Sequence, residues 1–285
     1  MSYETLVDTA TLAAHLEDPA WRVIDCRSDL GDASAGALGF ARGHIPGSVY
    51  AHLDQDLSAP RTPWSGRHPL PEPAALAATF GRLGIGVGIQ VVACDESGGA
   101  YATRLWWLLR WLGHRAVAVL DGGLPAWRAE HRPLVTTTSV VAPREFAARP
   151  DHAAYVSADD VASLVGRRAA VLLDARARER FEGRFEPLDP KAGHVPGARS
   201  HPFSANLGAD GRFLPPAALR ERFSALLGSA PASTIISMCG SGVTACHTLL
   251  ALEIAGLEGA RLYPGSWSEW CRDPGRPVAT VEDSN

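Results

Sequence analysis

The chain has 285 residues, of which 46% are hydrophobic and 20% are charged, and its formal net charge is -4 at pH 7. This length suggests two ordinary domains, and the weakly acidic balance gives no general attraction to nucleic acid or to an anionic membrane. No apolar run approaches the ~18 residues that a membrane helix needs, and the first residues lack the pattern of a secretory signal. We therefore expect a cytoplasmic protein without membrane or nucleic-acid partners.

The chain repeats itself in the same order in its two halves. "VIDCR" resembles "LLDAR", and "GHIPGS" matches "GHVPGA". Further on, "LWWLLRWLG" corresponds to "TLLALEIAG", and "LDGGLPAW" to "YPGSWSEW" at the same spacing. The period is far too long for a solenoid and indicates a duplicated globular domain. We expect an N-terminal domain over 1–135, a linker over 136–155, which has no clean periodicity, and a C-terminal domain over 156–285.

The second half alternates short apolar runs with helical patterns. Residues 169–176, 233–238 and 260–265 are the expected strands, and residues 216–228 and 243–256 are the expected helices. Strands that are buried on both faces and alternate with helices are typical of a parallel sheet. The predicted fold class is therefore α/β, with two tandem domains that each consist of a parallel sheet flanked by helices.

The five cysteines are scattered along the chain and form neither a C-x-x-C pair nor a grouping with histidine at zinc spacing. A chain of this size does not need disulfide staples, so we expect free thiols. The question is then which thiol, if any, is reactive.

The stretch "MCGSGVT" places Cys239 directly after an apolar strand and before a helix. Ligands of open α/β sheets bind at the carboxyl ends of strands. Gly240 and Gly242 permit backbone angles that turn successive N–H groups inward, and the helix that starts with Val243 and Thr244 adds the positive end of its dipole. Such a pocket stabilises a thiolate or a persulfide anion. We therefore expect a sulfur nucleophile here, although a cysteine beside a turn is often only a small buried hydrophobe.

In the first repeat the corresponding loop reads "DESGGAYA", and the constant spacing places Glu96 opposite Cys239. The glycines are retained there, but a carboxylic acid cannot act as a sulfur nucleophile. We therefore expect the N-terminal domain to be catalytically inactive and the C-terminal domain to carry the chemistry.

Together these motifs resemble those of the tandem rhodanese-domain sulfurtransferases over nearly the whole chain. The resemblance rests on "GHIPG", "GHVPGA", "CGSGVTA" and "YPGSWSEW". It implies a rhodanese-like fold for each domain and transfer of sulfane sulfur through a cysteine persulfide. The implied partners are a small-molecule sulfur donor and an acceptor, either cyanide or a thiol such as thioredoxin or a small thiol. Because the protein itself carries the sulfur, neither a metal nor an organic cofactor is implied.

The loop also discriminates between donors within this family. Thiosulfate-specific members typically place basic residues after the cysteine, whereas Gly240 and Ser241 follow here. That loop is similar to the loop of 3-mercaptopyruvate sulfurtransferases, whose donor carries a single carboxylate. The resemblance then implies a proton relay of Ser241, His68 and Asp54. His68 is also readable as a loop histidine that caps a turn, and Asp54 as a solvated turn residue.

Arg180 matches the family arginine that holds the substrate carboxylate, for which a guanidinium fork is well shaped. The alternative is one more surface charge in an arginine-rich segment. Mercaptopyruvate members usually carry a second arginine shortly downstream, but this chain is shorter there and offers Lys191, or Arg184 instead. The expected substrate-binding residues are Arg180, Lys191, Gly240, Gly242, Val243 and Thr244.

Three rival functions stay open at this point. The nearest is a thiosulfate sulfurtransferase. Such an enzyme releases sulfite from thiosulfate and forms thiocyanate when cyanide is the acceptor. A phosphatase of a related fold needs an arginine at the sixth position after the cysteine, where this chain has Ala245. A non-catalytic sulfur carrier is disfavoured by the intact "CGSGVTA" loop.

Overall fold

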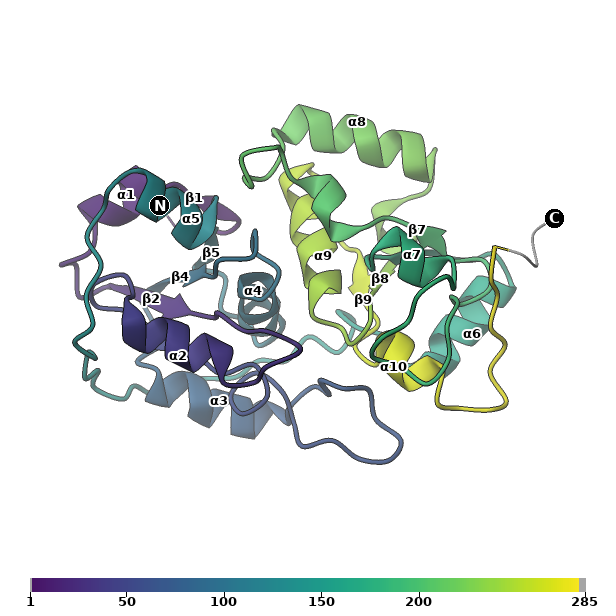
Figure 1. The fold of residues 1–285 in the computed structure, drawn as a ribbon, viewed down its shortest axis with the longest axis horizontal. Coiled ribbons are helices and arrows are strands. Elements are labelled where there is room, and N and C mark those ends of the chain that lie inside the picture. Colours follow the sequence, from purple (N-terminus) through teal and green to yellow (C-terminus); the bar gives the residue numbers. More distant parts are fainter. Residues whose placement is uncertain (1, 282–285) are drawn as a thin grey trace. The chain divides into compact units, whose positions relative to one another are not determined.

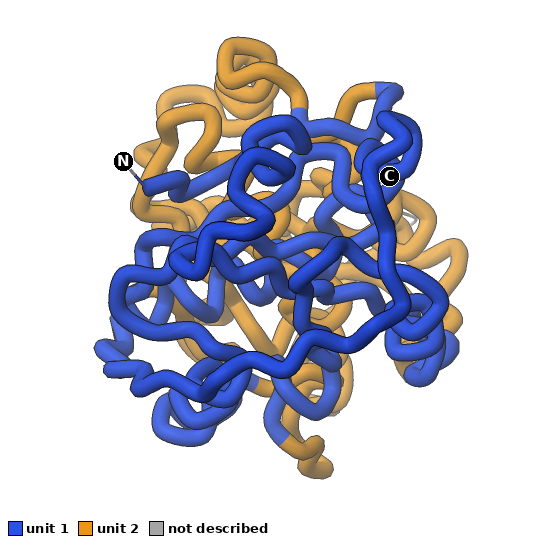
Figure 2. Tube along the Cα trace, turned by 90° about the vertical axis from the view of Figure 1, so that its left-hand side faces the viewer, with its two compact units in different colours: residues 1–59, 70–151, 209–213 blue, residues 60–69, 152–208, 214–285 orange. Residues whose placement is uncertain are grey.

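A computed structural model describes residues 2–281 of the chain. Its contacts divide the chain into two compact units, which Figure 2 shows in different colours. Unit 1 comprises residues 1–59, 70–151 and 209–213. Unit 2 comprises residues 60–69, 152–208 and 214–285. Each unit has its own sheet and helices (Figure 1), which confirms the α/β fold with two tandem domains.

Among the described residues, unit 1 contains a five-stranded sheet in the order β1-β5-β4-β2-β3, with every neighbouring pair parallel. Its strands are β1 (Leu6–Val7), β2 (Trp21–Asp25), β3 (Val49–Tyr50), β4 (Gln90–Cys94) and β5 (Val117–Leu120). Its helices are α1 (Thr9–Ala14), α2 (Ala35–Arg42), α3 (Pro73–Arg82), α4 (Ala102–Trp111) and α5 (Gly123–Ala129). Strand β4 is buried along its whole length, and α4 packs on it and on β5.

Over the described part of the chain, unit 2 contains a four-stranded parallel sheet in the order β7-β6-β8-β9. Its strands are β6 (Val171–Asp174), β7 (Arg199–Ser200), β8 (Ile235–Met238) and β9 (Arg261–Leu262). Its helices are α6 (Ala158–Gly166), α7 (Arg178–Phe181), α8 (Pro216–Leu227), α9 (Thr244–Ile254) and α10 (Ser266–Trp270), with short 3-10 turns η1 (Phe203–Asn206) and η2 (Ala232–Thr234). The predicted strands and helices of this half are thus confirmed, with shorter strands than the apolar runs suggested.

Residues 60–69 lie inside the first sequence repeat but group with unit 2. The backbone N–H of Arg67 donates to Ser268 Oγ at 2.9 Å, and the Arg272 guanidinium donates to the carbonyl of Ser65 at 2.9 Å. Ser268 lies in α10, and Arg272 is the second residue after this helix. Residues 60–69 therefore pack as part of unit 2, although they belong to the first sequence repeat.

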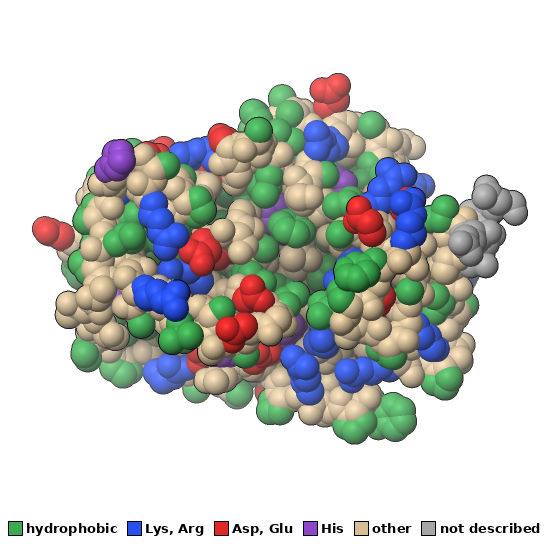
Figure 3. All heavy atoms as spheres, in the orientation of Figure 1, with side chains coloured by type: hydrophobic (Ala, Val, Ile, Leu, Met, Phe, Trp, Pro, Cys, Tyr) green, Lys and Arg blue, Asp and Glu red, His purple; other side chains and the backbone are tan. Residues whose placement is uncertain are grey.

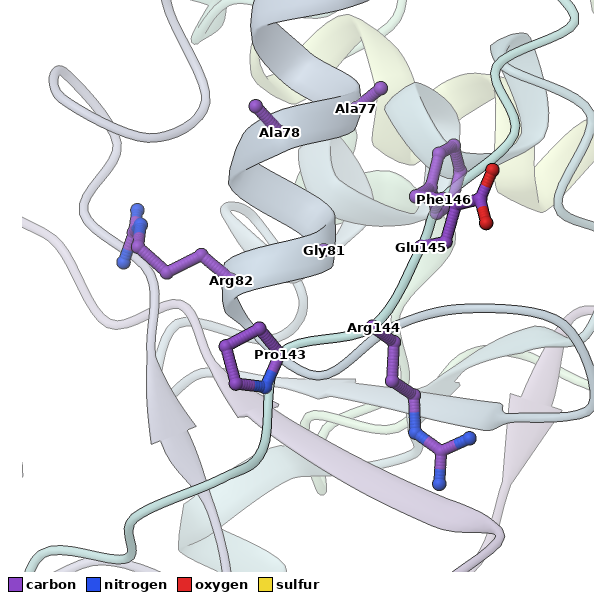
Figure 4. A pocket seen from close by; sticks show the side chains of 8 residues that line it. All are labelled: Ala77, Ala78, Gly81, Arg82, Pro143, Arg144, Glu145 and Phe146. Atoms are coloured by element: carbon purple, nitrogen blue, oxygen red, sulfur yellow. The ribbon is translucent and has the colours of Figure 1, made fainter.

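Residues 136–151, which form most of the predicted linker, group with unit 1. The N–H of Arg144 donates to the carbonyl of Gly81 in α3 at 2.9 Å. A Cβ at Gly81 would lie 2.5 Å from the Arg144 carbonyl, so this close approach requires a glycine. A hollow of about 370 Å³ lies between α3 and residues 143–146, and Figure 4 shows the side chains that line it. The domain boundaries at 135 and 156 stay predictions.

Within residues 2–281 no helix has the length and apolar character required to cross a membrane. On the face shown in Figure 3, basic and acidic side chains are interspersed. That face therefore has no broad field of a single sign.

Candidate active site

Cys239 directly follows β8 and is 2% exposed. Its N–H donates to Ser266 Oγ at 3.1 Å, and its carbonyl accepts the N–H of Trp267 at 3.0 Å, so α10 anchors the start of the loop. The sulfur accepts the N–H of Gly242 at 3.2 Å. The thiol therefore faces inward to a backbone donor of its own loop, an arrangement that favours a sulfur anion.

The two glycines of the loop have different roles. Gly242 has a φ of +77°, and a Cβ there would lie 2.4 Å from the carbonyl oxygen of Pro264. Gly240 does not adopt the left-handed conformation, but a Cβ there would lie 2.7 Å from Nη2 of Arg67 and 3.4 Å from Nη1 of Arg180. The positive φ of Gly242 fits the expected turn of the backbone, whereas Gly240 makes room for two guanidinium groups, and its part in turning N–H groups inward stays a prediction.

Val243 and Thr244 carry the loop into α9. Val243 is the N-cap residue and is buried, and Thr244 is the first residue of the helix. The first turn of α9 therefore begins where the loop ends, so the positive end of the helix dipole lies at this point.

His68 reaches the loop from the segment 60–69. Its Nδ1 lies 2.7 Å from Ser241 Oγ, and both side chains are buried. Which atom donates depends on the histidine tautomer. A hydroxyl paired with an imidazole in this way can pass a proton in either direction. The structure thus brings together two of the three predicted relay residues within unit 2.

Asp54 belongs to unit 1 and follows β3. Its backbone N–H donates to Nδ1 of His52 at 3.1 Å. Its part in a relay with Ser241 and His68 stays a prediction.

Arg180 lies on α7 and its guanidinium pairs with Glu186 at 2.7 Å and with Asp189 at 3.3 Å. Arg67 pairs with the same carboxylate of Asp189. Both guanidinium groups also lie against Gly240. One carboxylate therefore bridges two cations directly beside the cysteine loop.

No sequence pattern singles out Arg67, yet its position is informative. Within the described residues, its buried Nε and Nη2 atoms have no hydrogen-bond partner. These two atoms form one edge of the guanidinium, the edge that can hold a carboxylate with two parallel hydrogen bonds. Leaving such donors buried and unpaired costs free energy, so a bound anion would relieve the cost. The available signal in the sequence was its place next to His68 in "GRHPLP".

The two sequence candidates for the second cation are placed differently. Lys191 is exposed, and its backbone carbonyl accepts the Nε1–H of Trp267 at 2.9 Å. Arg184 is exposed and pairs with Glu182 at 2.5 Å. These contacts favour Arg67 over Lys191 and Arg184 as the second cation beside the loop.

Three of the other thiols are held in their neutral form. Burial raises the pKa of Cys26 and Cys94 well above the ordinary value, and it also raises the pKa of Cys271. Nearby carboxylates add to each effect. These thiols are therefore poor nucleophiles near neutral pH.

The structure corrects the position that corresponds to Cys239 in unit 1. The first residue after β4 is Asp95, and its carbonyl accepts the N–H of Leu124 at 2.8 Å, as the Cys239 carbonyl accepts that of Trp267. The prediction that Glu96 replaces the cysteine is therefore wrong by one residue. The reason is that the loop from β4 to α4 is longer than the loop from β8 to α9. A carboxyl group still stands where unit 2 has a thiol.

The structure thus consists of two tandem α/β units, each with a parallel sheet. In the second unit a buried thiol lies in a glycine-containing loop at the carboxyl end of a strand. These features define the protein as a tandem α/β-domain protein with a thiol site of this kind in its second unit. The model of the rhodanese-like domain matches residues 8–130 and 157–273, and the chain therefore belongs to the rhodanese-like domain family, with two tandem copies.

Relatives with this organisation match along nearly the full length. The chain is 50% identical to the probable 3-mercaptopyruvate sulfurtransferase of Pseudomonas aeruginosa, over 98% of this chain and 99% of that protein. It is 39% identical to the putative thiosulfate sulfurtransferase SseB of Mycobacterium tuberculosis, over 96% of each. The crystal structure of SseA from Escherichia coli, described as a 3-mercaptopyruvate sulfotransferase, superposes with a TM-score of 0.81 at 32% identity, over 94% of this chain and 100% of that one.

Proposed function

We propose that this protein is a sulfurtransferase that moves sulfane sulfur from 3-mercaptopyruvate to a thiol or cyanide acceptor and releases pyruvate. The observation that carries this proposal is the Cys239 sulfur facing the Gly242 N–H, in a loop that also meets His68 and two arginines. The full-length relative from Pseudomonas aeruginosa supports the choice of donor.

Donor binding uses the two cations beside Gly240. The free edge of Arg67 holds the donor carboxylate, and Arg180 adds a second positive charge on the same side of the loop. This places the donor sulfur over Cys239, so that binding energy from the carboxylate orients the reacting atoms.

In the first half-reaction the Cys239 thiolate forms a bond to the donor sulfur. The carbon–sulfur bond breaks, and its electron pair goes to the carbon fragment, which leaves as the enolate of pyruvate. Ser241, paired with His68, delivers a proton to this enolate, and the proton of the transferred sulfur replaces the one that was delivered. The loop N–H groups stabilise the resulting persulfide anion.

In the second half-reaction the thiolate of an acceptor attacks the outer sulfur. The sulfur–sulfur bond to Cys239 breaks, and its electron pair restores the Cys239 thiolate. Thioredoxin or a small thiol in the cytoplasm is the proposed acceptor, and cyanide serves in an assay. Two half-reactions on one cysteine give ping-pong kinetics.

A thiosulfate sulfurtransferase is the second candidate. Arg67 and Arg180 supply positive charge that the residues after Cys239 do not, and a dianionic donor would benefit from both. The relative from Mycobacterium tuberculosis supports this alternative.

The deciding experiment compares pyruvate release from 3-mercaptopyruvate, with a thiol acceptor, against thiocyanate formation from thiosulfate and cyanide. Faster turnover of 3-mercaptopyruvate is expected, and faster turnover of thiosulfate would establish the second candidate. The variant Cys239→Ser should lose turnover. The matched control is Cys246→Ser, because a hydroxyl can keep the 3.3 Å hydrogen bond from residue 246 to the Gly242 carbonyl. Full activity of Cys239→Ser would refute the mechanism.

A further inference from the structure

The carboxylate of Asp189 is an unusual feature beside the cysteine loop. Its side chain is 2% exposed, one oxygen pairs with Nη1 of Arg67, and the other accepts Nη2 of Arg180 at 3.3 Å. Its own N–H donates to Oε1 of Glu186 at 3.2 Å, so the loop that carries it is fixed as well. A buried acid therefore sits where a binding site for anionic donors would be expected to keep only cations.

The pairing has a geometric consequence for Arg67. Asp189 binds the Nη1 end of the guanidinium. Among the described residues, the opposite edge, with Nε and Nη2, has no hydrogen-bond partner. Nη2 of this edge lies against Gly240 of the cysteine loop. Asp189 therefore orients the edge that is free to bind a donor.

The pairing also has an electrostatic consequence. Among the described residues, a connected network of ion pairs contains three arginines and three carboxylates, namely Arg67, Arg176, Arg180, Asp174, Glu186 and Asp189. The formal charges of this network cancel. A donor with one negative charge then adds one uncompensated charge to the site, and a donor with two negative charges adds two.

We propose that Asp189 is a specificity-determining residue that orients Arg67 and makes the site prefer singly charged sulfur donors over doubly charged ones. The inference rests on the proposed sulfurtransferase function. Coulomb energy is proportional to the charge of the ligand, so removing one negative charge strengthens the binding of a dianion about twice as much, in free energy, as that of a monoanion. Loss of the Arg67 orientation weakens the binding of both donors, so this effect cancels in the ratio of their kcat/KM values.

The test is the ratio of kcat/KM for thiosulfate to kcat/KM for 3-mercaptopyruvate. In Asp189→Asn this ratio should rise on the order of tenfold, because the carboxylate and the donor charges are close together in a buried site. In Asp189→Glu, which keeps the charge, the ratio should stay within about twofold of the wild-type value. A purely structural role would lower both rates equally, and an unchanged ratio in Asp189→Asn would overturn the proposal.

A second measurement does not depend on turnover. Inert anions that occupy the site should protect Cys239 from alkylation by iodoacetamide, with pyruvate as the monoanion and sulfate as the dianion. Asp189→Asn should improve protection by sulfate more than protection by pyruvate, and equal changes would refute the role of its charge. If the wild-type protein turned over neither donor, the proposed function would fail, while this measurement would still decide the role of Asp189.

Glu186→Gln provides an independent variant should Asp189→Asn not fold. It removes one charge from the same network without removing a partner of Arg67. The ratio of kcat/KM for thiosulfate to kcat/KM for 3-mercaptopyruvate should again rise. Absence of a shift in this variant would count against the electrostatic argument in the same way.

Discussion

The loops that follow β4 in unit 1 and β8 in unit 2 begin at equivalent positions but hold different groups. In unit 1 the Asp95 carboxylate accepts backbone N–H groups at 2.8 to 2.9 Å from Ser97, Gly99, Tyr101 and Ala102. In unit 2 the loop N–H of Gly242 faces the Cys239 sulfur. Both loops therefore direct N–H groups at an acceptor that can be anionic. In unit 1 this acceptor is the carboxylate of Asp95, which belongs to the loop itself.

The surroundings of the two loops are otherwise closely alike. Arg27 pairs with Asp25 at 2.7 Å and donates to the carbonyl of Gly43 at 2.9 Å. Arg176 pairs with Asp174 at 2.7 Å and donates to the carbonyl of Gly193 at 2.7 Å. The duplicated motifs thus preserve a buried ion pair in each unit. We therefore attribute the predicted inactivity of unit 1 to the residue that starts its loop rather than to decay of its scaffold.

The largest effect is expected when unit 2 is given the first loop residue of unit 1. Cys239→Asp should abolish sulfur transfer, because a carboxylate cannot form a persulfide. The free energy of unfolding should stay close to the wild-type value or increase, because the loop N–H groups gain an acceptor like that in unit 1. Turnover assays and urea unfolding measure the two outcomes. Retained turnover would show that another thiol carries the sulfur.

The next largest effect concerns the Ser241–His68 pair of unit 2. Ser241→Ala should lower kcat by about 100-fold, the lower range for loss of a positioned proton donor. His68→Gln should have a similar effect, and the double variant should be little worse than either single one because the two residues act as a unit. Additive losses in the steady-state kinetics would argue against a shared proton path.

A smaller loss is expected at the cation that serves the open loop. Arg67→Lys keeps the charge but removes the two-pronged edge, so kcat/KM for 3-mercaptopyruvate should fall by about 10-fold to 100-fold, as loss of charge-assisted hydrogen bonds implies. Lys191→Ala is the matched control and should leave kcat/KM nearly unchanged, because its ammonium is exposed. A larger loss of kcat/KM in Lys191→Ala than in Arg67→Lys would instead identify Lys191 as the second cation.

The smallest effect is on stability, and both units should contribute to it. Burial lowers the pKa of His114 in unit 1 and of His201 in unit 2 below the ordinary histidine value. The unfolded chain therefore takes up protons near pH 6.5 that the folded protein does not, and the free energy of unfolding should fall as the pH drops below that value. Urea midpoints at pH 7.5 and 5.5 measure this fall. His201→Asn should make the fall shallower, and an unchanged slope would contradict the contribution of His201.

Much of the site was predictable because its chemistry is encoded locally. The order of an apolar strand, Cys239, two glycines and a helix identifies a thiol at the carboxyl end of a sheet strand. The duplicated motifs likewise predict two α/β domains and a first-domain loop, "DESGGAYA", that lacks the thiol. Spacing alone assigned Glu96 instead of Asp95, because a constant offset cannot reveal that one loop is longer than the other.

The sequence by itself determined the class of fold, the duplication and the reactive cysteine, since strand and helix periodicity and loop composition act over a few residues. Only the tertiary structure decided which distant side chains complete the site. His68 is 173 residues from Ser241, and Arg67 is 122 residues from Asp189. Their contacts form because the segment 60–69 packs with unit 2, and such packing depends on the shape of the whole folded unit rather than on any local pattern.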